Sequence, residues 1–143
     1  MTEGEMTLLG LFLTCLGLLY TGEQIRRARK VAQADFLFKL DDHFLNHIEA
    51  HTKLRPGGEW SRPGTGPKSH DEWIMVEKYM GLFERVYVLI DSKIISKKII
   101  DRLYGYRVSN IIHNEIIYDT KLVQEKDGWE DFLNLANVLG RNK

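Results

Sequence analysis

The segment at residues 55–68, RPGGEWSRPGTGPK, carries the side chains best suited to binding chemistry. It holds all three prolines of the chain, so it is a loop rather than a regular helix or strand. Guanidinium and backbone N–H groups suit phosphate oxygens, and an indole can stack on a nucleobase. The side chains in or beside this loop that could contact such a ligand are Arg55, Trp60, Arg62, Lys68 and His70.

This loop therefore predicts a site for an anionic, nucleotide-like ligand. A helix that begins at Ser69 would add the positive end of its dipole to the site. The alternative is a solvated linker with incidental charges, because no Walker or dinucleotide fingerprint accompanies the loop.

Three histidines, His43, His47 and His51, recur every four residues and would lie along one flank of a continuous helix. Two histidines at this spacing can bind zinc. The pattern lacks the glutamate of an H-E-x-x-H motif, so we expect no metal site, although the spacing alone leaves the question open.

The sequence offers no arrangement typical of an enzyme. The acidic pairs Asp71-Glu72 and Glu130-Asp131 are adjacent in sequence, so on a helix their carboxylates point in different directions. Both pairs also fit the first turn of a helix, where the dipole stabilises negative charge. We expect no catalytic residue and no cofactor.

The uncharged run from Met6 to Gly22 predicts a helix that spans a membrane. A signal peptide fits poorly because Glu3 and Glu5 replace the usual basic residues, whereas the core helix of a soluble domain is a remaining alternative. The basic cluster at 26–30 predicts that the N-terminus faces outward and that residues 23–143 are cytoplasmic, at the inner (cytoplasmic) membrane.

Small residues within this run share one helical face at a 4-3-4 spacing: Gly10, Thr14, Gly17 and Thr21. Such a face lets helix backbones approach closely in lipid, so it predicts a homo-oligomer. The alternative is that glycine and threonine are simply common in membrane helices.

Composition places the rest of the chain among folded domains. Its 143 residues include 20 Lys and Arg and 20 Asp and Glu, a balance that gives no reason to expect long nucleic acids as partners. The single cysteine, Cys15, excludes a disulfide within the chain.

Helical periodicity predicts an all-α fold. We expect residues 1–22 to form a tail and a transmembrane helix that continues to about His51, and residues 23–143 to form a cytosolic bundle of about four helices. Ser69 and Glu72 make a capping box at the start of one helix, while Ser96 and Asp127 could cap two others.

Three stretches, IRRARKVAQADFLFKL (25–40), YMGLFERVYVLIDSKII (79–95) and LYGYRVSNIIHN (103–114), resemble a diffuse group of small bacterial proteins. Those proteins have one N-terminal membrane helix and a helical cytosolic domain, and their function is unknown. The layout is also similar to the membrane-anchored effectors of type III CRISPR defence. That resemblance implies a cytosolic domain that binds a cyclic oligoadenylate and a membrane part that acts on the bilayer.

These observations support a membrane-anchored, oligomeric sensor and effector, as in antiviral defence. The alternative is a membrane-tethered interaction adaptor without a small-molecule ligand. Its contact surface would carry Tyr104, Tyr106 and Arg107, types that are enriched at protein interfaces.

Overall fold

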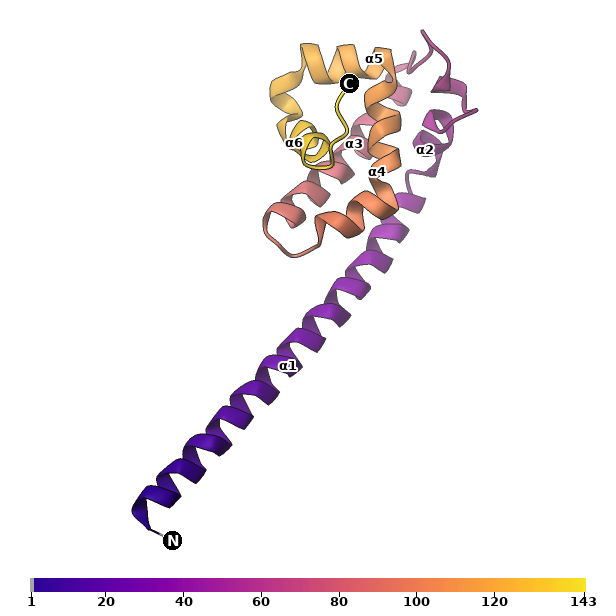
Figure 1. The fold of residues 1–143 in the computed structure, drawn as a ribbon. Helices are drawn as coiled ribbons and strands as arrows, with labels where there is room; N and C mark the ends of the chain where they lie inside the picture. The colour runs from indigo at the N-terminus through magenta and orange to yellow at the C-terminus, as the bar shows by residue number, and fades with distance from the viewer. Residues whose placement is uncertain (1) are drawn as a thin grey trace. The chain divides into compact units, whose positions relative to one another are not determined.

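A computed structural model describes residues 2–143, and within this range all regular structure is helical (Figure 1). The prediction of an all-α fold is confirmed. The α-helices are α1 (Glu3–Leu45), α2 (Ile48–Leu54), α3 (His70–Asp91), α4 (Lys97–His113), α5 (Glu115–Ile117) and α6 (Glu130–Val138). A 3-10 turn, Glu59–Ser61, lies between α2 and α3, and a π-helical segment, Tyr118–Gln124, follows α5.

The chain divides into two compact units, one ending at Lys39 and the other running from Leu40 to Lys143. The first unit is the major part of α1, and its apolar side chains are exposed, including Leu8 and Leu18 at 69% and 68%. Among the described residues, α1 is the helix long and apolar enough to cross a bilayer. Its 43 residues extend about 65 Å, roughly twice the hydrocarbon core.

Threonine hydroxyls on α1 are satisfied within the helix itself. Thr14 donates to the Gly10 carbonyl and Thr21 donates to the Gly17 carbonyl, each at 2.8 Å. A bilayer core offers no water to such groups, so these bonds suit a helix in lipid. Apart from the neighbouring residues and the backbone of the helix itself, no atom lies within 4 Å of a Cβ added at Gly10 or Gly17. This face is therefore open, and its role in association stays a prediction.

The second unit is built around aromatic rings. Phe44, at the end of α1, lies 4.5 Å from the ring of Tyr104 and 5.1 Å from that of Phe83. Phe83 in turn lies 6.2 Å from Phe132, because α3 packs mainly against α6. The predicted capping box is confirmed at the start of α3, where Ser69 and Glu72 bond each other's backbone N–H groups.

The predicted continuous helix to His51 is wrong, because α1 ends at Leu45 and α2 begins at Ile48. His47 takes φ −116° and ψ 22°, and its N–H donates to the Phe44 carbonyl at 3.0 Å. On a straight helix Ala50 would lie about 120° around the axis from Phe44. The break turns α2 so that both residues are buried.

Two further caps differ from expectation. Ser96 precedes α4 but makes no side-chain cap bond. Trp129, rather than Asp127, stands at the cap position of α6, since Asp127 belongs to a 3-10 turn. Packing of Phe132 and Leu135 in the core therefore fixes the start of α6 in place of a side-chain cap.

Phe44→Ala should lower the free energy of unfolding by about 3–5 kcal/mol, because it removes a ring that is 2% exposed and packed on two others. Urea unfolding of the full chain in detergent, followed by tryptophan fluorescence, measures this change. The matched control is Leu45→Ala, since Leu45 is 62% exposed and should shift stability by less than about 0.5 kcal/mol. Equal effects of the two substitutions would contradict the assignment of Phe44 to the core.

Candidate ligand-binding site

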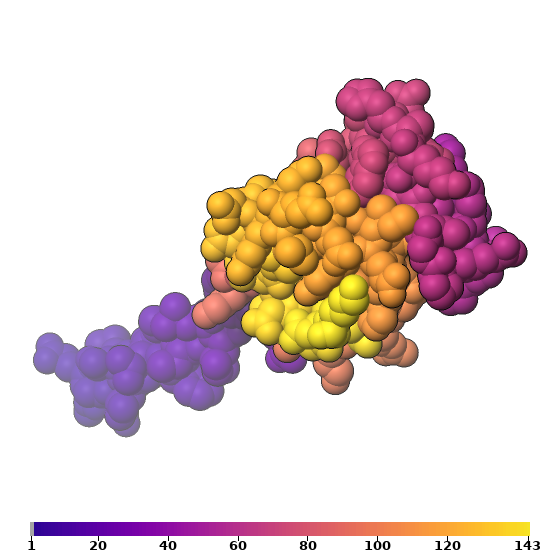
Figure 2. Space-filling model, turned by 90° about the horizontal axis from the view of Figure 1, so that it is seen from above, coloured from indigo at the N-terminus to yellow at the C-terminus, as the bar shows by residue number. Residues whose placement is uncertain are grey.

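A cavity of about 290 Å³ opens between the loop at 55–68 and the junction of α4 with α5. Figure 2 shows the loop, in magenta, against the orange segment that contains this junction. Its polar and aromatic lining comes from both segments: Trp60, Ser61, Arg62, Asn110, His113, Asn114 and Glu115. The cavity therefore combines a guanidinium, an imidazole, a carboxylate and side-chain amides.

The side chain of Asn114 holds the two walls of the cavity together. Its amide nitrogen donates to the carbonyls of Trp60 at 3.0 Å and Thr65 at 2.9 Å. Its oxygen accepts from the N–H of Ile117 at 2.9 Å and so caps α5. Because Asn114 is only 6% exposed, water competes little for these bonds. The two loop carbonyls that it binds lie on either side of Arg62.

The glycines of the loop allow a close return of the chain after α2. A Cβ at Gly58 would collide with the carbonyl oxygens of Thr52 and Lys53, so this position requires glycine. Gly57 has φ +81°, in the left-handed region that glycine favours. The chain therefore turns back tightly enough to bury Trp60.

Lys53 and Glu72 fix the other side of the loop. The Lys53 ammonium lies 3.0 Å from Glu72, 3.1 Å from Glu59 and 5.0 Å from the centre of the Trp60 ring. Glu72 also accepts from the N–H groups of Lys68 at 2.8 Å and Ser69 at 3.2 Å. The Lys68 N–H, then the Lys53 ammonium and the Ser69 N–H, hold the pKa of Glu72 at about 2. The carboxylate of Glu72 thus lies at the positive end of α3, and binding of a ligand there stays a prediction.

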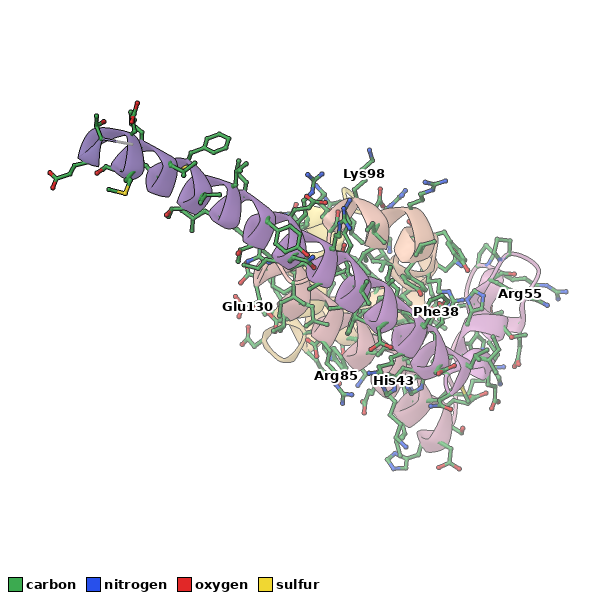
Figure 3. The ribbon with its side chains drawn as sticks, turned by 90° about the horizontal axis from the view of Figure 1, so that it is seen from below. Phe38, His43, Arg55, Arg85, Lys98 and Glu130 are labelled. Carbon is green, nitrogen blue, oxygen red and sulfur yellow. The ribbon has the colours of Figure 1, made fainter. Side chains whose placement is uncertain are left out.

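Of the five residues predicted from the loop, two line the cavity and three do not. Trp60 and Arg62 line the cavity, Trp60 buried and Arg62 exposed. Arg55, Lys68 and His70 are also exposed but do not line it. Figure 3 shows Arg55 pointing away from the domain. The Trp60 indole is 3% exposed and has Lys53 over its ring, so the ring has little free surface on which a base could stack, and its contact with a ligand stays a prediction.

The residues that line the opposite wall were not among those predicted. Asn110, His113 and Asn114 stand at i, i+3 and i+4, so α4 presents them on one face. Within residues 2–143, the Asn110 Nδ2 and the Trp60 Nε1 are buried N–H groups without an acceptor. In sequence, the residues of this polar face flank the buried Ile111 and Ile112. This stretch was assigned to the core from its isoleucines, and the polar residues were therefore missed.

The histidine flank does not persist in the fold. His43 lies in α1, His47 in the turn and His51 in α2, so the three do not share one continuous helix. Burial lowers the pKa values of His47 and His51, and nearby basic groups, including Arg107 beside His51, lower them further. In the part of the chain that the structure describes, no group of three His, Cys, Asp or Glu residues could hold a metal.

The surface suggested for an adaptor is also mostly internal. Tyr104 is 3% exposed, and its hydroxyl donates to Asp41. The Arg107 guanidinium lies 4.8 Å from the centre of the Phe44 ring and is half-buried. Only Tyr106, at 47%, is well exposed among the three residues, so they do not form a continuous contact surface.

Comparison with protein-family models, curated proteins and solved structures gives no match. Arg62 has no carboxylate within ion-pair distance among residues 2–143, so its charge is available to an anion. His113 can add a donor, while Glu115 can accept from a hydroxyl or an amine.

Glu72→Gln should destabilise the protein at neutral pH but have little effect near pH 2. The folded pKa of about 2 lies below the ordinary 4.5, so the stabilisation is present above pH 4.5 and is lost as the pH falls toward 2. Thermal unfolding at several pH values measures this difference. Glu59→Gln is the matched control, since that carboxylate contacts the same lysine but is 63% exposed, against 21% for Glu72. A pH-independent effect of Glu72→Gln would contradict this role.

Proposed function

We propose that this protein is a membrane-anchored sensor and effector whose C-terminal unit binds an anionic, nucleotide-like ligand. The observation that carries the proposal is the cavity in which Arg62 and His113 lie with Asn110 and Glu115. An arginine and an imidazole suit a phosphate, and a carboxylate suits the hydroxyls or exocyclic amine of a nucleoside. The one hydroxyl among the lining residues, that of Ser61, donates to the Gly58 carbonyl at 2.7 Å rather than to a base, so the proposal is for binding rather than catalysis.

The size of the cavity restricts the ligand. Its volume of about 290 Å³ lies near the lower end of small-molecule sites, about 300–1,000 Å³. It therefore takes a ligand of about one nucleotide, or one nucleotide unit of a larger ring such as a cyclic oligoadenylate. The rest of such a ring would contact further copies of the chain, which suits a symmetric oligomer.

Helix α4 provides a route from the cavity to α1. Asn110 and His113 line the cavity near the end of α4. Arg107 and Tyr104, about one and two turns earlier, contact the last turns of α1. Those contacts are the hydrogen bond to Asp41 and the packing on Phe44. A ligand that shifts α4 would thus act on the base of the membrane helix.

The effector step is assigned to α1. Copies of α1 would associate through Gly10, Thr14, Gly17 and Thr21, with the N-terminus outside and the C-terminal unit in the cytoplasm. A change in their packing would alter the inner membrane, as in the membrane effectors of type III CRISPR defence. The internal positions of Tyr104 and Arg107 disfavour the adaptor alternative.

Arg62→Ala should weaken ligand binding at least tenfold, because it removes the cation of the cavity. We would measure thermal unfolding of the full chain in detergent with inorganic phosphate, AMP, cyclic dinucleotides and cyclic oligoadenylates. A ligand at about 100 times its Kd stabilises the folded state by about 2.7 kcal/mol, which is a readily measured shift.

The matched control is Arg55→Ala, which removes the arginine of the other Arg-Pro-Gly repeat and leaves the cavity lining intact. It should keep the affinity of the parent protein. Equal loss in the two variants, or no shift with any of these anions in a folded sample, would contradict the proposed site.

Gly10→Leu combined with Gly17→Leu should weaken self-association of the full chain in detergent by about tenfold or more. Both Cβ positions are open, so the substitutions leave the isolated helix unchanged and act on helix–helix packing alone. The control is Leu8→Ala with Leu19→Ala, on the opposite face of α1. Sedimentation equilibrium measures the self-association of both double variants. A greater loss of self-association in the Leu8→Ala, Leu19→Ala control would contradict the assigned face.

A further inference from the structure

The corner between α3 and α4 departs from the usual residue preferences at its tightest point. Lys93 has φ +56°, in the left-handed region that glycine favours. Its N–H donates to the Ile90 carbonyl at 2.9 Å, and the next N–H, of Ile94, donates to the Leu89 carbonyl at 2.9 Å. These two bonds form a Schellman motif, in which the left-handed position is usually glycine. A lysine here is therefore less favourable for the stability of the turn than glycine would be.

The start of α4 departs from preference in the same direction. Helix N-termini favour acidic side chains and a polar cap, yet the first turn of α4 has no acidic residue and begins with Lys97 and Lys98. Ser96 makes no side-chain cap bond. Figure 3 shows Lys98 pointing outward. The positive helix end and the added lysines therefore repel one another in the free protein.

An exposed apolar side chain lies among these cations. Ile94, in the turn, is 59% exposed, and Val88 in the last turns of α3 is 50% exposed. In a Schellman motif the residue after the left-handed one usually packs on the helix end, but here it stays open to solvent. Among residues 2–143, no carboxylate lies within ion-pair distance of Lys93, Lys97 or Lys98.

We infer that this corner, formed by Lys93, Ile94, Lys97 and Lys98, is a docking surface for an anionic lipid bilayer. Lipid phosphates neutralise the three lysines and the positive end of α4, and Ile94 enters the apolar part of the interface. A nucleic acid or an acidic protein surface would match the charges but offer little to an exposed isoleucine. All three departures from preference are then explained by one partner.

This inference rests on the anchoring part of the proposed function and is independent of the cavity. A chain held to the bilayer by α1 gives its own C-terminal unit a high effective concentration at the lipid surface. A modest affinity is then sufficient. At about fivefold per basic residue, the three lysines together favour the docked state by roughly a hundredfold.

The test uses the full chain with Cys15→Ser, in nanodiscs of phosphatidylcholine alone or of an equimolar mixture with phosphatidylglycerol. An environment-sensitive fluorophore on Ser92→Cys reports contact of the corner with lipid, because Ser92 is exposed and next to Lys93. We expect a blue shift in the anionic discs only. A fluorophore on Gln124→Cys, another exposed position, should not respond.

Lys97→Gln with Lys98→Gln should reduce the ratio of docked to free corner about 25-fold, at about fivefold per charge. The matched control, Lys78→Gln with Lys126→Gln, removes two exposed lysines elsewhere and should change it less than twofold. Carbonate extraction reports anchoring by α1 separately, so loss of anchoring is distinguishable from loss of docking. An anchored chain that gives the same emission in both kinds of disc, or that responds to added RNA instead, would overturn the inference.

Lys93→Gly separates docking from an ordinary structural role. Glycine suits the left-handed conformation, so the melting temperature in detergent should rise by a few degrees while docking falls about fivefold. A merely structural lysine would give a variant in which both quantities fall or docking is unchanged, and either result would count against the inference.

Discussion

Asn114 donates from one buried amide to two carbonyls of the loop, and with its oxygen it caps the helix that follows α4. Both walls of the cavity therefore depend on one side chain. Removing it would leave the carbonyls of Trp60 and Thr65 and the N–H of Ile117 without their partners, at about 1–3 kcal/mol for each buried group. A loop rich in glycine and proline has little structure of its own, so these bonds are what turn it into the wall of a site.

Helix α4 connects the cavity with the aromatic core. One of its ends carries Asn110 and Asn114, and Tyr104 and Arg107 bind the last turns of α1. Arg107 is held by aromatic rings rather than by a carboxylate, and its Nη1 has no acceptor within the described residues. Such packing fixes the guanidinium less tightly in direction than a bidentate ion pair does. In the proposed mechanism, this junction is where a shift of α4 would be accommodated.

Local patterns were sufficient for the parts of the fold that depend on neighbours in sequence. The capping box of Ser69 and Glu72 and the apolar run of α1 were both read correctly, because each needs only a few adjacent residues. The break after Leu45 was missed, since Leu40, Phe44 and Ile48 continue a helical pattern although Ile48 is 47% exposed. The two Arg-Pro-Gly repeats look alike in sequence. Both arginines are exposed, and only the contacts of Asn114, formed across about fifty residues, place Arg62 rather than Arg55 in the wall of the cavity.

The two ends of α3 differ in how well their residues suit the helix termini. At its start, Ser69 and Glu72 complete a capping box, and Lys53 adds an ion pair to it. At its end, Lys93 occupies a left-handed position and Ile94 is exposed, although glycine at the first would stabilise the same turn. The start of α3 has a complete capping box, whereas its end has residues that lower stability. Weak selection for stability would not explain why only the end has such residues. The cost is confined to the corner where cations and an apolar side chain gather, so we place the selective reason in what that corner contacts.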